Sequence, residues 1–302
     1  MPLSEYPTLK KTSEIFQKNH RFSGAIVGRC FELFGDDWAV EFERVLSGLF
    51  IDDDALAKAI NGYSIFAMHS MRLQAQFERE GIYKSKSYAE AAQEVYFNEQ
   101  LMMSEYLPGL LLSHFLWPHH YRQIQFFNTA FLGAMKNASA TSFIEVGVGT
   151  GIYSNLALQK LSEISGVGVD ISPSSKKFTD LQMQALGMSS RYHVELRDIT
   201  GEPLPNKTDW LVCVEVLEHL EDPVGFLRGL RANMNPGARA FITAAINAAH
   251  TDHIYLYRNA NQVLAHLNEA GFTLEQYFVG AAYKPSSPGL PIPEAVAFIV
   301  QN

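Results

Sequence analysis

Residues 142–154 read SFIEVGVGTGIYS, and this stretch decides the fold of the chain. It begins with the aromatic and β-branched residues of a buried strand, and its glycines mark a turn before a helical pattern begins. Because glycine has no Cβ atom, Gly147, Gly149 and Gly151 allow a ligand to approach the backbone closely. Such a turn is shared by nucleotide-binding folds and by loops without a ligand, so its meaning depends on the surrounding sequence.

The sequence after the turn alternates between helical and strand-like segments. Ile152 to Leu161 has helical periodicity, and Gly166 to Ile171 is a short apolar strand that contains Asp170. Asp170 lies about 20 residues after the glycines, where a carboxylate can accept hydrogen bonds from two ribose hydroxyls. Seven strands are expected, over residues 142–147, 166–171, 192–198, 210–214, 238–244, 273–281 and 295–301. Helices between the first five predict a parallel sheet covered on both faces.

The end of the chain departs from this alternation. Asn261 to Ala270 is helical in pattern and stops at Gly271, but the last two strands are joined only by a proline-rich loop, Lys284 to Pro293. Parallel neighbours need a crossover, whereas antiparallel strands can be joined directly as a hairpin. We therefore expect an antiparallel last strand, which argues against a dehydrogenase.

Several motifs, in the correct order, resemble the class I S-adenosylmethionine (SAM) dependent methyltransferases. Glu145 begins the sequence EVGVGTG, which resembles the first motif of that family, whereas a dinucleotide-binding loop normally has its last glycine two positions later. Residues 197–199, RDI, follow the third strand as the adenine-contacting acid of the family does, and residues 209–220 resemble its fourth strand. The resemblance covers residues 138–302 and is to a ubiquinone-biosynthesis-like methyltransferase domain with an N-terminal helical domain. It implies an α/β fold with a Rossmann-like, seven-stranded class I methyltransferase sheet and an all-helical lid.

The resemblance also implies SAM as the cofactor and gives roles to residues at the strand ends. The backbone at Gly147 and Gly149 would reach the methionine and ribose portions. Glu145 would orient the loop or meet the amino group, unless it only caps backbone amides. Asp170 would hold the ribose, unless it caps the next helix, and Asp198 would accept from the adenine amino group. The implied cofactor-binding residues are Glu145, Gly147, Gly149, Gly151, Asp170, Ile171, Asp198, Ile199 and Glu215.

Residues 1–137 show helical periodicity throughout and almost no strand-like alternation. Five helices are expected, over residues 8–20, 25–50, 54–79, 87–117 and 119–136, with turn or capping residues at each break. Gly35 lies within the second span, which could therefore be two helices, and Pro108-Gly109 should break or kink the fourth. The chain thus divides into a helical lid or substrate domain, residues 1–137, and a SAM-binding domain, residues 138–302.

The composition limits the classes of function. The net charge is −8, from 24 basic and 32 acidic residues, and no basic run could neutralise a nucleic acid backbone. The longest apolar run, Leu107 to Trp117, is too short to span a bilayer. Cys30 and Cys213 lie far apart in apolar segments, as expected for reduced thiols in a cytoplasmic protein. The expected partner is a small-molecule substrate, with no nucleic acid and no membrane, and the chain could form a homodimer.

Candidate catalytic residues lie in two segments. Leu116 to Tyr121 could roof the site, and Tyr121 could place an aromatic face over the sulfonium, unless these aromatic residues form helix core. The loop Asn247 to Arg258, after the fifth strand, is rich in polar and aromatic residues. His253 is its candidate general base, because an imidazole titrates near physiological pH. Tyr255, the third candidate, could instead line the pocket.

The pattern Glu215-x-x-Glu218-His219 suggests a metal site, because offsets of three and four place all three side chains on one face of a helix. With His250 or His253 as a fourth ligand, it resembles the E-x-x-E-H site of small-RNA 2′-O-methyltransferases and of ubiquinone O-methyltransferases. There a divalent ion holds and acidifies the substrate hydroxyl. The VLEHL sequence is also frequent in family members without a metal, where these side chains pack or hydrogen-bond locally. The sequence alone therefore assigns no metal.

The leading interpretation is a SAM-dependent methyltransferase that acts on N, O or C of a small molecule by in-line transfer. An alternative is a SAM cyclase of the azetidine-2-carboxylate synthase type, in which the amine of SAM attacks its own γ-carbon and methylthioadenosine leaves. A third interpretation is a non-catalytic SAM-binding partner subunit, although the intact cofactor motifs argue against it. The family favours secondary metabolism but does not specify the acceptor.

Overall fold

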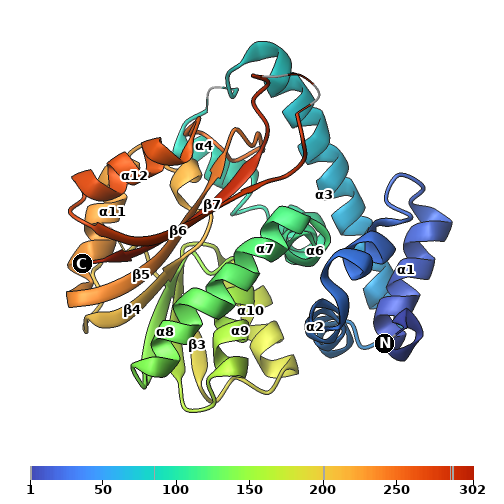
Figure 1. The fold of residues 1–302 in the computed structure, drawn as a ribbon, viewed down its shortest axis with the longest axis horizontal. Helices are drawn as coiled ribbons and strands as arrows, with labels where there is room; N and C mark the ends of the chain where they lie inside the picture. Colours follow the sequence, from blue (N-terminus) through green and yellow to red (C-terminus); the bar gives the residue numbers. More distant parts are fainter. Residues whose placement is uncertain (1, 85, 200, 286, 288) are drawn as a thin grey trace.

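The computed structural model describes residues 2–84, 86–199, 201–285, 287 and 289–302. It combines a helical first half with a seven-stranded sheet that lies between helices (Figure 1). Positions 286 and 288 of the expected loop at 284–293 lie outside the described residues. In the described part of the chain, every helix is too short or too polar to span a bilayer.

The seven strands form one sheet in the order β3-β2-β1-β4-β5-β7-β6. Strands β1 to β5 pair in parallel, and β7 is antiparallel to both β5 and β6. The predicted antiparallel last strand is therefore confirmed. The strands are β1 Ser142–Val146, β2 Ser165–Asp170, β3 Tyr192–Leu196, β4 Thr208–Cys213, β5 Met234–Ile246, β6 Thr273–Ala281 and β7 Glu294–Gln301.

The parallel register aligns the ends of the central strands. Val146, the last residue of β1, is opposite Val169 in β2 and Cys213 in β4. In open α/β sheets, ligands bind outside the carboxyl ends of the strands. The glycine turn after β1, Asp170 at the end of β2 and Glu215 just after β4 therefore lie at the edge where a ligand is expected.

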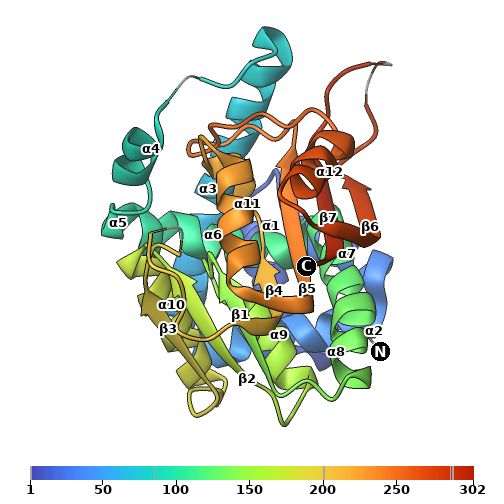
Figure 2. The ribbon, with the colours of Figure 1, turned by 90° about the vertical axis from the view of Figure 1, so that its left-hand side faces the viewer.

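Four helices of the second half pack on the sheet: α9 Ile152–Lys160, α10 Pro173–Ala185, α11 Pro223–Ala232 and α12 Ala260–Glu269. Helices α11 and α12 cover one face, where Leu227 and Val263 are fully buried, and they lie in front of the sheet in Figure 2. On the other face, the rings of Phe127 and Phe131 lie 5.0 and 5.7 Å from the ring of Phe241 in β5. The helical first half and this face of the sheet therefore share one apolar core.

The first half contains many short segments around three longer helices. Its elements are η1 Leu3–Glu5, α1 Pro7–Asn19, α2 Ile26–Leu49, α3 Asp53–Glu80, α4 Tyr88–Glu94, α5 Glu99–Leu101, the π-helical η2 Met102–Tyr106, α6 Leu107–Leu116, α7 Pro118–Phe126, the π-helical η3 Phe127–Phe131 and α8 Leu132–Asn137. Four of the five expected spans agree with helical segments to within one residue at each end. Gly35 has φ 69° and bends α2, where two helices were an alternative.

The fourth expected helix, 87–117, is wrong in one respect. The chain breaks at residues 95–98, where the side chain of Asn98 accepts from the N–H of Leu101 and begins α5. Pro108 does not break the helix: Tyr106, two residues before it, has helical φ −66° and ψ −59°, and the π-helical segment η2 leads directly into α6. The preceding π-helical segment η2 absorbs the irregularity instead.

Candidate active site

A cavity of about 1480 Å³ lies between the helical half and the carboxyl edge of the sheet. Its walls include the glycine turn, the ends of β2 and β4, and residues of α3, α6 and α7. Pockets for one small ligand usually measure about 300–1,000 Å³. This cavity therefore has room for two small molecules side by side.

The three glycines of the turn have positive φ but serve different purposes. A Cβ atom at Gly147 would lie 2.5 Å from Val216 Cγ2, and one at Gly151 would meet a side chain of α10 equally closely, so packing requires both glycines. A Cβ atom at Gly149 would have only Leu110 Cδ2 nearby, at 3.8 Å, and this glycine lines the cavity. Gly149 is thus the position at which the backbone is open to a ligand. Gly151 lies outside the cavity lining, at the start of α9.

Asp170 braces the glycine turn. The N–H of Gly149 donates to its Oδ2 over 3.1 Å, and the N–H of Ser172 donates to its Oδ1 over 2.8 Å. Burial raises the pKa of the Asp170 carboxyl. Ser172, rather than Asp170, caps α10, since its Oγ accepts from the N–H of Ser175. Besides Asp170, the predicted cofactor residues that line the cavity near it are Ile171, Asp198 and Ile199.

Glu145 lines the cavity, and its carboxyl is hydrogen-bonded within the protein. Its side chain is almost fully buried, and Oε2 accepts from the N–H of Ser154 over 3.2 Å, from Ser154 Oγ, and from the hydroxyl of Tyr192 over 3.4 Å. Burial raises the pKa of Glu145 to about 8. The carboxyl therefore ties β1 to the first turn of α9, which was the alternative reading of this residue.

Two of the three predicted catalytic residues lie outside the cavity lining. Tyr121 is buried in the helical half, where its hydroxyl donates to Glu41 over 3.3 Å and its ring packs on Phe34 at 4.8 Å. Tyr255 is hydrogen-bonded to His266 of α12 over 3.3 Å. Both tyrosines serve packing, so their predicted roles are not supported. His253 does line the cavity.

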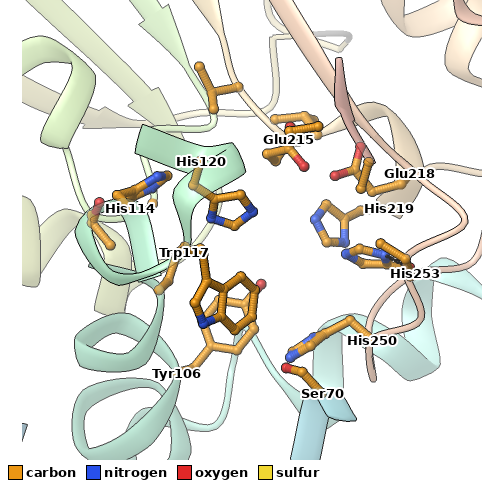
Figure 3. A pocket seen from close by; sticks show the side chains of 18 of the residues that line it. Ser70, Tyr106, His114, Trp117, His120, Glu215, Glu218, His219, His250 and His253 are labelled. Carbon is orange, nitrogen blue, oxygen red and sulfur yellow. Dashed lines mark hydrogen bonds between the residues drawn. The ribbon is translucent and has the colours of Figure 1, made fainter. Parts of the chain in front are cut away.

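Glu218, His219 and His253 form a cluster at the cavity wall, here called the acid-histidine cluster (Figure 3). One donor atom from each lies within 4.8 Å of the others. Glu218 is fully buried; among the described residues neither carboxyl oxygen has a hydrogen bond of good geometry, but the Glu215 carboxyl lies close enough to share a proton with it. Burial and the neighbouring Glu215 raise the pKa of Glu218 well above its usual value. Because ionising a buried carboxyl beside another one is costly, such a position favours either a proton or a bound cation.

Glu215 does not share a helix face with this cluster, contrary to the prediction. Its φ is 52°, in the left-handed region, and only Leu217–His219 forms a 3₁₀ turn, η4. Oε1 of Glu215 accepts from Thr243 Oγ over 2.6 Å, and the N–H of Glu215 donates to the same hydroxyl oxygen over 2.9 Å. Glu215 lines the cavity, but its carboxyl is held against β5.

Hydrogen bonds orient three histidines in the same way. Nδ1 of His253 lies 2.6 Å from the carbonyl of Ala248, and Nδ1 of His219 lies 3.0 Å from the carbonyl of Asp252. Because a carbonyl only accepts, both Nδ1 atoms carry the proton and both Nε2 atoms keep a lone pair. Nδ1 of His250 lies 2.6 Å from Oδ1 of Asp252, and its Nε2 is buried without a partner. A neutral imidazole with one free nitrogen is the form that binds a metal ion.

Asp252 connects these histidines to the helical half. Its fully buried carboxylate accepts from the hydroxyl of Tyr106 over 2.7 Å. Burial alone would raise the pKa of Asp252, but His219 and His250 hold it well below its usual value. Tyr106 is the last residue of the π-helical segment η2, and such segments are frequent at functional sites. Carboxylates that hold the far nitrogen of a metal-binding histidine are a common feature of metal sites.

The acid-histidine cluster fits a divalent metal ion. It offers one carboxylate and two imidazole nitrogens, a set that suits first-row transition metals. The carboxyl is buried beside that of Glu215, and the imidazoles already have their other nitrogen bonded. A second group, His250 with Asp252 and His253, lies beside it and shares His253.

The opposite wall of the cavity is formed largely by the predicted roof segment, Leu116 to Tyr121, although Tyr121, the residue chosen from it, lies outside the lining. His120 and Trp117 lie across the cavity from the acid-histidine cluster (Figure 3). His114 and His119 also line this wall. The one sequence signal for them is the pair of histidines after Trp117-Pro118, in the segment from which Tyr121 was chosen. Tyr106 and Asp252 had no signal beyond the general density of aromatic and polar residues.

Residues 144–240 match a family model described as a methyltransferase domain. The ubiquinone biosynthesis O-methyltransferase of Pseudomonas fluorescens strain SBW25 is 26% identical over 107 residues, which is 35% of this chain and 45% of that protein. The protein of the same name from Stutzerimonas stutzeri strain A1501 is 28% identical over 104 residues, which is 33% of this chain and 42% of that protein. The chain thus aligns with less than half the length of these curated relatives.

Solved structures extend the similarity of fold to the helical half. The mitomycin 7-O-methyltransferase MmcR has a TM-score of 0.57 and 13% identity, and the match covers 85% of this chain and 75% of that one. The O-methyltransferase NcsB1 from neocarzinostatin biosynthesis, in complex with SAM and 2-hydroxy-5-methyl naphthoic acid, has a TM-score of 0.51 and 17% identity, with coverage of 85% and 72%. At these identities the matches establish the architecture.

Proposed function

We propose, from the match of residues 144–240 to a methyltransferase domain, that the chain is a SAM-dependent enzyme that methylates a hydroxyl oxygen of a small aromatic molecule with the help of a divalent metal ion. One observation carries the proposal. The carboxyl of Glu218 is fully buried in the cavity lining, beside the Glu215 carboxyl and within 4.8 Å of the donor atoms of two histidines whose Nδ1 atoms are already bonded.

The cofactor would lie along the edge marked by Gly149, Asp170 and Asp198. The backbone of Gly149 is open to the cavity, and carboxylates at these strand ends can accept from ribose hydroxyls and from the adenine amino group. SAM, when bound, would supply a methyl carbon on a sulfonium, and in-line attack on that carbon would displace the thioether sulfur. The protein would hold the nucleophile in line with that carbon and exclude water.

The metal ion would be held by a carboxylate oxygen of Glu218 and by Nε2 of His219 and His253. When bound, such an ion lowers the pKa of a hydroxyl that coordinates it. Asp252 and the carbonyl of Ala248 keep the imidazoles in the tautomer that this role needs. The predicted general base, His253, thus becomes a metal ligand in this proposal.

An aromatic acceptor is supported by the walls of the cavity. The ring of Trp117 lies 5.9 Å from that of Phe66, with an interplanar angle of 29°, and 5.9 Å from that of His119, with an angle of 11°. Trp117, Phe66 and His119 all line the cavity, and a wall rich in aromatic rings favours packing of a flat ligand. The names of the ubiquinone biosynthesis relatives and the naphthoic acid bound to NcsB1 support the same substrate class. In this reading residues 1–137 are the lid and acceptor domain.

The size of the site favours an external acceptor over cyclisation of SAM. Attack by the cofactor's own amine needs no second ligand, whereas a cavity of about 1480 Å³ exceeds the space that one small ligand usually needs. The acid-histidine cluster also has no role in an intramolecular attack.

The test incubates the metal-reconstituted protein with SAM and a panel of phenols and vicinal dihydroxybenzenes, and measures S-adenosylhomocysteine and methylated product by mass spectrometry. We expect O-methylated product, loss of activity in a chelator, and recovery with Mg²⁺ or Mn²⁺. Glu218→Gln should prevent recovery, whereas Glu269→Gln, an exposed carboxyl on α12, should not. Full activity in the chelator would refute the metal, and absence of methylated product across the panel would refute the hydroxyl acceptor.

A further inference from the structure

We propose that His120 is the base that removes the proton from the acceptor hydroxyl. The assignment rests on the proposed function and adds a catalytic residue from the helical half. His120 lines the cavity, and its ring projects into the space between Trp117 and the acid-histidine cluster (Figure 3). It is therefore placed where an acceptor held at the cluster would present its hydroxyl.

The hydrogen bonds of Ser113 determine the tautomer of His120. The hydroxyl of Ser113 donates to the carbonyl of Leu110 over 2.8 Å, so its oxygen is left as an acceptor. Nδ1 of His120 lies 3.3 Å from that oxygen and therefore carries the proton. Nε2 of His120 consequently has the free lone pair that a base needs.

The surroundings of His120 keep it uncharged. The rings of Trp117, His119 and His114 lie 5.0, 4.4 and 5.6 Å from its ring. Burial, with smaller contributions from His119 and His114, lowers the pKa of His120 well below its usual value. The imidazole is thus unprotonated at neutral pH and Nε2 is free to accept, but burial also makes it a weaker base than an exposed histidine, so its role depends on an acidified acceptor hydroxyl.

The backbone fixes the position of His120. Trp117 is extended, with φ −102° and ψ 114°, and separates α6 from α7. Pro118 then begins α7, so His120 lies in the first turn of that helix. Its neighbour Tyr121 is rotated by about 100° around the helix and faces the core instead. A short break between two rigid helices is well suited to holding a catalytic side chain in one orientation.

The proposed step is balanced in atoms and charge. The acceptor O–H bond breaks, and its proton moves to Nε2 of His120. The oxygen forms a bond to the methyl carbon while the bond from that carbon to sulfur breaks, and its electron pair returns to sulfur. The positive charge of the sulfonium is thereby replaced by that of the His120 imidazolium. His253 is not available for this step, because its Nε2 belongs to the acid-histidine cluster.

The first test measures methylation of catechol by the full chain with SAM and Mg²⁺. His120→Ala should lower kcat by about 100-fold or more, while the affinities for SAM and metal stay unchanged. Added imidazole should restore part of the lost kcat, because it can accept the same proton. His193→Gln, an exposed histidine on β3 outside the cavity lining, is the matched control and should keep its activity. A normal kcat in the His120→Ala variant would overturn the role of His120. Weak SAM binding without rescue by imidazole would also overturn it, because the loss would then be structural.

A second test does not depend on the acceptor. Nitrogen-15 NMR of histidine-labelled protein, assigned with His120→Gln, should show a neutral His120 ring with the proton on Nδ1. Ser113→Ala should increase the share of the other tautomer. A proton on Nε2 in the unchanged chain would overturn the role of His120 whatever the acceptor is. Failure of the unchanged chain to methylate any hydroxyl would instead overturn the proposed function.

Discussion

Glu145 provides a quantitative prediction about stability. Its carboxyl is 1% exposed, and burial raises its pKa to about 8, against an ordinary value of 4.5. The folded protein therefore keeps this proton at pH values where the unfolded chain has lost it. Because the folded state binds more protons, the contribution of Glu145 to the free energy of unfolding is largest at low pH and falls as the pH rises towards 8.

The magnitude follows from the size of the shift. One pKa unit corresponds to about 1.4 kcal/mol, so the contribution of Glu145 should fall by about 3 kcal/mol between about pH 5 and pH 7.5. Glu145→Gln keeps an oxygen that can accept from the N–H of Ser154 but cannot titrate. The stability of the unchanged chain relative to the variant should therefore decrease by this amount over the interval.

The assay is denaturant unfolding of both proteins, without cofactor, at several pH values. Comparing the unchanged chain with Glu145→Gln removes the contribution of the histidines to the unfolding free energy, because both proteins contain them. The lowered pKa values of these histidines give the opposite pH dependence. For example, burial lowers the pKa of His114 and of His119 to about 4. The contribution of these two groups to the free energy of unfolding therefore falls as the pH falls. A difference in unfolding free energy that stays constant from pH 5 to 7.5 would refute the burial argument for Glu145.

Three further predictions concern the cavity. Gly149→Ala should weaken SAM binding by about tenfold or more in calorimetry, because its φ of 50° is unfavourable for alanine and its Cβ would enter the cavity; unchanged affinity would contradict this. Glu218→Gln should abolish tight Mn²⁺ binding yet raise the thermal midpoint of the metal-free protein at neutral pH, because folding no longer requires the uptake of a proton by a carboxyl that is ionised in the unfolded chain; a lower midpoint would contradict it. Tyr106→Phe should weaken Mn²⁺ binding about 10- to 100-fold through Asp252, and equal affinity would show that this hydrogen bond does not position the histidines.

Much of the fold could be predicted from the sequence because its signals are local. The switch from helical to alternating periodicity at residue 141, and the lack of a helix between the last two strands, predicted the sheet and its antiparallel end. The break that the sequence predicted at Pro108, and that the structure does not show, has a local cause too. The π-helical turn just before Pro108 accommodates the proline in a continuing helix, and the sequence did not show that turn.

The site was predicted only where one segment supplies it. The glycine turn and the βα spacing place Gly149 and Asp170 at the ends of neighbouring strands, so the sequence alone could predict their position at the edge of the sheet. Tyr106 and Asp252 lie 146 positions apart and meet only through packing of the two halves. His120 and Tyr121 are adjacent, and the start of α7 decides which of them faces the cavity. Such choices depend on tertiary contacts that periodicity does not contain.

The most direct test of the central claim is to follow the methyl group itself. The protein, loaded with Mg²⁺, is incubated with SAM carrying a carbon-13 methyl group, with and without catechol, and the products are identified by mass spectrometry and NMR. Methyl transfer to an acceptor oxygen predicts S-adenosylhomocysteine and a labelled methoxy group, formed only when catechol is present. Release of labelled methylthioadenosine from SAM alone, with a cyclic amino acid as the second product, would contradict the account and favour cyclisation.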